Sequence, residues 1–233
     1  RQMCIRDRVE ECMLAANSAV AEEVSTGTFA GLYRIHPEPE PEKLEEFSLF
    51  VSTVLKRMPG DLSNRKICNS FLDSLPDDHR KYVITSNFLR AMARASYSAE
   101  PGLHYGLGKT RYSHFTSPIR RYSDLVLHQQ LHAAAENTRL RSKKTLTTIA
   151  LECSKREERN DEAYFAANDR LKLHYLKQQN ALESLRLYEG VIVKISSQGM
   201  ICDIPEYGLR GFVPARFLRS RTKRPPKAGD FIY

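Results

Sequence analysis

The chain has 233 residues, of which 41% are hydrophobic, and its formal net charge is +8 at pH 7. This length allows one large domain, or a medium domain followed by a small one, and the hydrophobic fraction is ordinary for a globular protein. No apolar run approaches the roughly 20 residues of a membrane-spanning helix and no apolar leader is recognisable, so we expect a cytoplasmic protein without a membrane partner.

The net charge indicates the kind of partner, and the cysteines exclude two kinds of cross-link. A basic balance favours a polyanion such as a nucleic acid. The five cysteines are scattered along the chain without the spacing of metal ligands (Cys4, Cys12, Cys68, Cys153 and Cys202). We therefore expect reduced thiols and neither a disulfide framework nor a zinc site.

The N-terminal residues 1–8 show no periodicity and resemble a translated sequencing adaptor, so we expect a non-native leader and exclude it from the fold. From residue 9 to residue 24, apolar side chains recur at helical spacing, which predicts a helix. Glu10 and Asn17 lie seven residues apart and therefore fall within about 20° of each other around this helix. Taken alone, such a pair is more typical of an exposed surface than of a functional site.

A short extended segment and three helices are predicted next. Residues 32–36 alternate as a strand does, and the prolines of 37–42 predict a stiff connector. Apolar periodicity predicts helices over 42–58, 65–75 and 78–97.

Residues 112–124, Tyr-Ser-His-Phe-Thr-Ser-Pro-Ile-Arg-Arg-Tyr-Ser-Asp, are the most informative stretch of the chain. Ser117 is followed by a proline, which predicts a helix over 118–136 that begins with a capping hydroxyl and a proline at its first position. Arg120 and Arg121 then fall in the first turn, where two cations oppose the helix dipole unless an anion offsets them.

The two arginines therefore predict a phosphate site at a helix N-terminus. The alternative is a pair of arginines bound to nearby carboxylates. Asp124 lies one turn after Arg120, so we expect these two side chains to pair and to fix the direction of the guanidinium. His104, in the glycine-rich loop 98–110, is a weaker candidate contact.

A long, charged helix is predicted over 143–178, and the periodicity changes near residue 186. Strands are predicted at 187–195, 200–204 and 208–214, and the chain ends at Tyr233 within a further strand. Short strands separated by turn signals at this spacing suggest a small barrel.

Phe212 is the best candidate in this barrel for stacking on a base, although a buried core position is equally consistent with the sequence. A basic run follows, and beside a barrel it favours phosphate binding (Arg216, Arg219, Arg221, Lys223 and Arg224).

Residues 114–125 resemble the His-Phe-Thr-Ser-Pro-Ile-Arg-Arg-Tyr-x-Asp-Leu signature of the RNase II/RNase R (RNB) family of 3′→5′ exoribonucleases. Residues 104–108 with Tyr112 resemble the segment that precedes this signature. The helix over 9–24 and the glycine and apolar pattern of 190–214 also resemble the family, most closely its bacterial RNase R branch.

The resemblance implies an α+β fold in two parts. The mainly helical C-terminal part of an RNB catalytic domain occupies 9–183, and a truncated all-β OB barrel that binds RNA occupies 184–233. The implied function is that of a monomeric enzyme that hydrolyses single-stranded RNA processively from the 3′ end to nucleoside 5′-monophosphates. Two alternatives stay open: a non-catalytic RNA-binding relative of the same fold, and a generic OB-containing nucleic-acid protein whose arginine pair is structural.

Site residues follow from the same resemblance. Arg120 is implied to contact the phosphate at the cleaved end and is the one catalytic residue expected in this chain. The residues implied to bind RNA are Glu10, Asn17, His104, Tyr112, His114, Thr116, Ser117, Arg121, Tyr122, Phe212 and Arg216.

A magnesium ion is also implied, held by aspartates that we expect upstream of residue 9, so we expect no metal ligand in this chain. Asp77 and Asp78 are adjacent but lack the family's metal-site context. Phe165 and Ala166 stand where many bacterial relatives carry Arg-Asp, which weakens any assignment of function in the long helix. We therefore expect the chain by itself to be inactive or nearly so.

Overall fold

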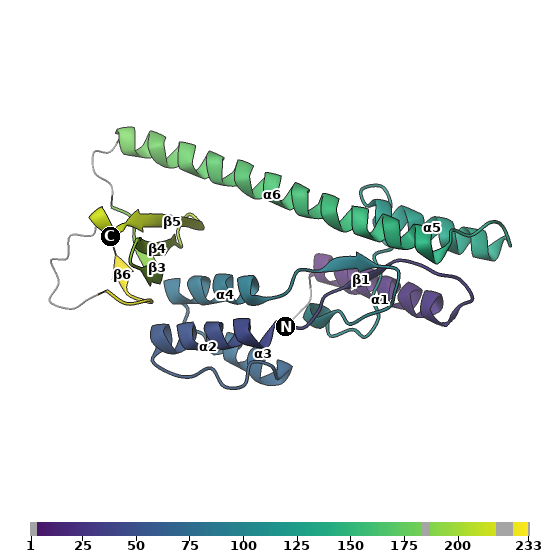
Figure 1. Ribbon diagram of the computed structural model, residues 1–233, viewed down its shortest axis with the longest axis horizontal. Coiled ribbons are helices and arrows are strands. Elements are labelled where there is room, and N and C mark those ends of the chain that lie inside the picture. Colours follow the sequence, from purple (N-terminus) through teal and green to yellow (C-terminus); the bar gives the residue numbers. More distant parts are fainter. Residues whose placement is uncertain (1–3, 183–186, 218–225, 233) are drawn as a thin grey trace. The chain divides into compact units, whose positions relative to one another are not determined.

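The computed structural model describes residues 4–182, 187–217 and 226–232 (Figure 1). The chain forms two compact units, and neither is continuous in sequence. The first unit consists of Arg1–Glu38 and Ala93–Ala163, and the second unit consists of Pro39–Met92 and Tyr164–Tyr233. These units divide the chain differently from the predicted domain boundary near residue 184, which stays a prediction. Helices dominate and the main sheet is small and antiparallel, so the predicted α+β class is confirmed.

The first unit is built on two whole helices, part of a third and a small two-stranded sheet. Its elements are α1 (Ile5–Thr26), β1 (Tyr33–Ile35), β2 (Ser96–Ser98), the 3₁₀ turn η1 (Tyr105–Leu107), α5 (Tyr122–Ala135) and the first part of α6 (Lys143–Leu182). Strands β1 and β2 pair antiparallel. The buried core residues of this unit are Ala21, Val24, Leu32, Tyr33, Tyr97, Ala99, Val126, Leu127, Leu146 and Ala150.

Helix α1 begins at Ile5, four residues before the predicted start, because the Asp7 carboxylate accepts the backbone N–H of Cys4 at 3.1 Å. Its first half is exposed, and burial begins at Asn17. The apolar positions that predicted the helix are therefore exposed near its start and packed near its end: Val9 is 53% exposed, whereas Val20 packs against the core of the first unit. Whether residues 1–8 are native stays a prediction.

Helix α4 (His79–Ala91) is shorter than predicted, because the backbone is extended at Met92. Its start agrees with the sequence, since the Asp78 side chain accepts the N–H of Arg80 at 2.8 Å. The predicted helical end at Tyr97 is wrong: Tyr97 lies in β2 opposite Arg34 and is buried in the core of the first unit.

The second unit combines helices with a four-stranded sheet. Besides α4 and the rest of α6 it contains α2 (Pro41–Leu55), α3 (Arg65–Asp73), β3 (Gly190–Ser196), β4 (Gly199–Ile204), β5 (Leu209–Pro214), η2 (Ala215–Phe217) and β6 (Phe231–Ile232). The strand order is β5-β4-β3-β6 with antiparallel neighbours. The strands predicted from alternation are confirmed within a few residues at each end.

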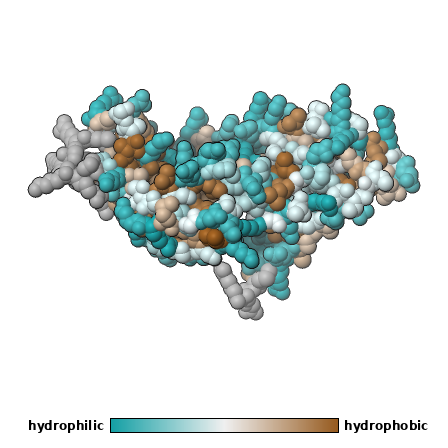
Figure 2. Space-filling model, turned by 60° about the horizontal axis from the view of Figure 1, so that its bottom comes forward, coloured by the Kyte–Doolittle hydropathy of each residue, from teal (hydrophilic) through white to brown (hydrophobic). Residues whose placement is uncertain are grey.

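In the described part of the chain, no helix combines the length and apolarity needed to cross a bilayer. On the face shown in Figure 2, hydrophobic side chains form small separate patches among hydrophilic ones.

A buried ion pair joins the sheet of the second unit to its helices. Asp203, on β4, is 2% exposed. Arg210, on β5, donates from Nε and Nη2 to the two carboxylate oxygens of Asp203 at 2.5 and 2.8 Å. The same guanidinium donates to Oδ1 of Asn87 on α4 at 3.2 Å, and Arg90 of α4 lies 3.8 Å from Asp203.

We expect Arg210→Met to destabilise the second unit by about 3 kcal/mol, because the change leaves the Asp203 carboxylate buried without its bidentate partner. Arg80→Met is the matched control, since the pair of Arg80 with Asp78 is partly exposed and such pairs contribute about 0 to 1 kcal/mol. Urea unfolding followed by circular dichroism measures both. Equal losses for the two variants would contradict the assigned role of Asp203.

Candidate functional site

A cavity of about 840 Å³ lies in the first unit, along the N-terminal end of α5 and one face of α6. Arg120, Arg121 and Tyr122 line it from the segment that leads into α5. On α6, four polar lining residues recur at a spacing of four: Thr148, Glu152, Arg156 and Asn160. Residues spaced by four share one face of a helix, so α6 supplies a continuous polar wall.

Residues 117–121 form a separate turn, here called the arginine turn, and are not the start of the helix. The N–H groups of Arg120 and Arg121 donate to the carbonyl of Ser117 at 3.3 and 3.0 Å. Arg121 then adopts an extended backbone (φ −120°, ψ 117°), and α5 begins at Tyr122. The predicted helix start at residue 118 is therefore wrong, because the hydrogen bonds to Ser117 complete a turn and the extended backbone of Arg121 separates this turn from the helix.

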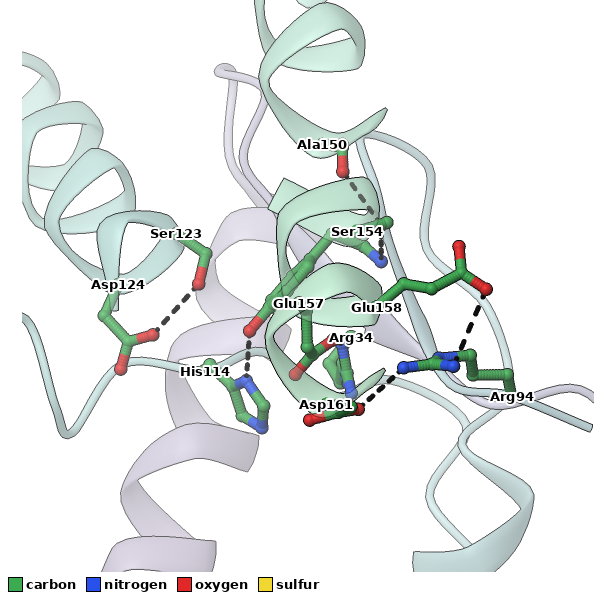
Figure 3. Close-up of polar contacts among 11 residues, drawn as sticks. Arg34, Arg94, His114, Ser123, Asp124, Ala150, Ser154, Glu157, Glu158 and Asp161 are labelled. Carbon is green, nitrogen blue, oxygen red and sulfur yellow. Dashed lines mark hydrogen bonds and ion pairs between the residues drawn. The ribbon is translucent and has the colours of Figure 1, made fainter. Parts of the chain in front are cut away.

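Asp124 explains this geometry. Its side chain is fully buried, and Oδ2 accepts the N–H of Ser117 at 2.8 Å and Nη2 of Arg121 at 2.9 Å. The hydroxyl of Ser123 donates to Oδ1 at 3.2 Å (Figure 3). The expected pairing of Asp124 with Arg120 is wrong: the carboxylate binds the neighbouring arginine.

Arg120 differs from Arg121 in its surroundings. It is exposed, it lines the cavity, and it has no ion pair or side-chain hydrogen bond with any residue that the structure describes. The two interpretations of the arginine pair therefore apply to one residue each: Arg121 is bound to a carboxylate, and Arg120 is available to an anion.

The acids that line the cavity all have arginine partners. Arg34 binds Glu157 at 2.5 Å, and its guanidinium lies 4.7 Å from the ring centre of Tyr97. Asp161 accepts from Arg94 at 2.7 Å (Figure 3).

The third lining acid, Glu152, is paired with Arg156 on the same helix at 2.8 Å. Pairing reduces the repulsion that these carboxylates would exert on an anion near Arg120. Sequence reasoning missed this wall, although the spacing of four along α6 was a visible signal.

A row of aromatic rings runs beside the cavity. The ring centres of His104 and Tyr112 are 5.3 Å apart, those of Tyr112 and His114 are 5.8 Å apart, and those of His114 and Tyr97 are 5.7 Å apart. All three contacts are edge to face, the arrangement that aromatic quadrupoles favour. Nδ1 of His114 also lies 2.9 Å from the hydroxyl of Tyr97.

Both histidines of this row are neutral near pH 7. The pKa of His114 is lowered to about 3, first because burial disfavours the charged ring and second because Arg121 and Arg34 lie near it. The pKa of His104 is lowered to about 4 by burial and by His36. His114 lines the cavity, so it presents a neutral ring there.

Two predicted RNA contacts are engaged inside the protein. Asn17 donates from its amide to the hydroxyl of Tyr112 at 2.8 Å and accepts the N–H of Phe115 at 2.9 Å. Asn17 and Tyr112 are each 4% exposed. The structure thus makes both residues supports of the segment that leads to the arginine turn, and direct RNA contact by either stays a prediction.

The remaining predicted contacts are dispersed. Glu10 is exposed on α1, and Thr116 lies against α1 in a smaller groove. In the second unit, Phe212 is 54% exposed, so the alternative of a buried core position is wrong. The Arg216 guanidinium lies 4.9 Å from the ring centre of Phe217.

The rest of the basic run, Arg219, Arg221, Lys223 and Arg224, lies outside the described residues. Among the residues that the structure describes, no three His, Cys, Asp or Glu side chains are grouped so as to hold a metal ion. The described residues therefore do not fit a Mg²⁺ site.

We expect the stability of the first unit to fall between pH 7 and pH 5. A histidine whose pKa is lowered on folding stabilises the fold fully above about 6.5, the pKa in the unfolded chain, and this stabilisation is lost as the pH falls toward the folded pKa. His114 alone accounts for a loss of about 2 kcal/mol at pH 5.

Urea unfolding at several pH values measures this dependence. His114→Gln should flatten it by that amount. Because His104 contributes a separate share, part of the dependence should remain, and a dependence that is equally steep after the replacement of His114 would contradict the assignment.

Comparison with known proteins places the chain in a family. The family model described as the RNB domain matches residues 5–137. Ribonuclease R of Vibrio cholerae is 33% identical over 225 residues, which cover 88% of this chain and 26% of that protein. Ribonuclease R of Thermotoga maritima is 30% identical over 213 residues, which cover 88% of this chain and 29% of that protein. The chain therefore spans less than a third of the length of these relatives.

A solved structure shows the same fold. Mycoplasma genitalium RNase R in complex with ribose-methylated single-stranded RNA has a TM-score of 0.81 and 25% sequence identity, over 96% of this chain and 38% of that one. Because the family model covers more than half of the chain, including the arginine turn and α5, the protein belongs to the RNB domain family.

Proposed function

We propose that this chain is the phosphate-holding part of a processive 3′→5′ exoribonuclease that hydrolyses single-stranded RNA to nucleoside 5′-monophosphates. The observation that supports this proposal is Arg120, an exposed guanidinium on a cavity wall with no protein acceptor in the described structure. Membership of the RNB domain family gives the chemical context, and the RNA in the Mycoplasma complex is consistent with it.

The chemistry of Arg120 suits a phosphate. A guanidinium presents a planar set of donors that matches two oxygens of one phosphate, and it stays charged at every physiological pH. Its neighbour α5 adds a second attraction, because the N-cap residue makes no capping hydrogen bond and the helix N-terminus carries partial positive charge.

The phosphate contact contributes to hydrolysis as well as to binding. Negative charge builds up on the non-bridging oxygens as water attacks the phosphorus, and a pre-aimed donor stabilises this charge. Tyr122 lines the same cavity as Arg120 and is 55% exposed, and in this proposal it stacks on a base. His114 offers a neutral ring for hydrogen bonding at the same cavity.

The proposal has further parts that concern the whole enzyme. Mg²⁺ is held by residues outside the described part of this chain, the enzyme is monomeric and cytoplasmic, and this chain alone does not hydrolyse RNA. The second unit contributes contacts to single-stranded RNA through Phe212 and Arg216.

We expect Arg120→Ala to weaken binding of single-stranded RNA to this chain about tenfold, because one charge-assisted contact is lost. The slope of log affinity against log salt should fall by about 0.7, the value for one phosphate contact on a single strand. Fluorescence anisotropy with a labelled oligonucleotide measures both quantities.

Arg139→Ala is the matched control, since Arg139 is an exposed arginine of the same unit outside the cavity. Equal effects of the two variants would show that Arg120 acts only through net charge.

A second experiment tests catalysis. This chain can be joined to the preceding part of Vibrio cholerae Ribonuclease R, and the fusion must first hydrolyse RNA. Arg120→Lys should then lower turnover by about 10²–10³, with less than about tenfold loss in RNA affinity, because lysine lacks the planar donor pair. Similar losses in turnover and affinity would argue for a binding role without transition-state stabilisation.

A further inference from the structure

We infer that Asp124 is a positioning residue that decides which of two adjacent arginines takes the phosphate. This inference rests on the proposed function and goes beyond it, because it concerns how the site selects a single register for the strand. Asp124 itself is fully buried and does not line the cavity.

The arginine turn has little packing of its own. Ile119 is 100% exposed, and Arg120 beside it is also exposed. Apolar burial therefore cannot fix the direction of this segment, and hydrogen bonds must do so.

Asp124 holds both ends of the turn. Oδ2 accepts the backbone N–H of Ser117 at one end and Nη2 of Arg121 at the other, at 2.8 and 2.9 Å. Two further contacts fix Phe115, two residues before Ser117: its N–H donates to Asn17 at 2.9 Å, and its carbonyl lies 2.8 Å from Nε2 of His128 on α5.

The same carboxylate makes the two arginines unequal. Arg121 lines the cavity as Arg120 does, but its charge is matched by Asp124. A phosphate therefore meets one unmatched guanidinium at the turn, and the strand has one preferred position. Without the negative charge on Asp124, Arg121 would compete for the phosphate, and the strand could shift between the two arginines.

This selection predicts a coupling between residues 120 and 124. Asp124→Asn keeps the side-chain volume and an oxygen acceptor for Ser117, but it removes the charge that holds Arg121. In this background, we expect Arg120→Ala to weaken binding of labelled single-stranded RNA less than threefold, against about tenfold in the unchanged chain, because Arg121 takes over the contact.

Asp73→Asn, at an exposed aspartate of the second unit, is the control for net charge, and in its background the tenfold effect of Arg120→Ala should remain. If Asp124 were only structural, Arg120→Ala would cost tenfold in every background, and the inference would be overturned. If Arg120→Ala did not weaken RNA binding even in the otherwise unchanged chain, the result would instead contradict the proposed function itself.

A measurement on the unchanged chain covers the case in which Asp124→Asn does not fold. Uridine 5′-monophosphate is titrated while the Nε–Hε signals of the arginines are followed by NMR, with the signal of Arg120 assigned through Arg120→Lys. We expect the signal of Arg120 to shift and the signal of Arg121 to move by at most about one fifth as much. Comparable shifts of both signals would overturn the inference.

Discussion

The candidate site depends on the buried carboxylate of Asp124. A buried carboxylate costs several kcal/mol unless donors surround it, and Asp124 obtains donors from a backbone N–H, a guanidinium and a hydroxyl. Those donors belong to residues on both sides of the arginine turn, so satisfying the carboxylate closes the turn. The position of Arg120 on the cavity wall follows from this closure.

On the α6 side of the cavity, each acidic side chain is also paired with a positive charge. Glu152, Glu157 and Asp161 would together repel an anion, yet each is matched by an arginine. Arg34 also lies over the ring of Tyr97, which in turn contacts His114. The packing of the first unit and the electrostatics of its cavity therefore share the same side chains, and a change that unpairs one acid alters both.

Periodicity predicted most helices and the strands of the second unit, because these elements are long enough to repeat a pattern. It failed where contacts between residues distant in sequence determine the backbone conformation. The strand at Tyr97 has three residues and pairs with a segment more than 60 positions away, so no local pattern marks it. The serine and proline before Arg120 favour a helix start locally, and only the buried Asp124 shows that the chain forms a separate turn. The pair of Arg34 with Glu157, 123 positions apart, leaves no trace in the sequence.

The lowered pKa values of His104 and His114 have a consequence for the conditions under which the cavity works. Guanidinium groups do not titrate in water at moderate pH, and these two rings stay uncharged down to about pH 5. The two rings therefore add no positive charge in or beside the cavity at a pH at which a histidine in water would already carry a proton.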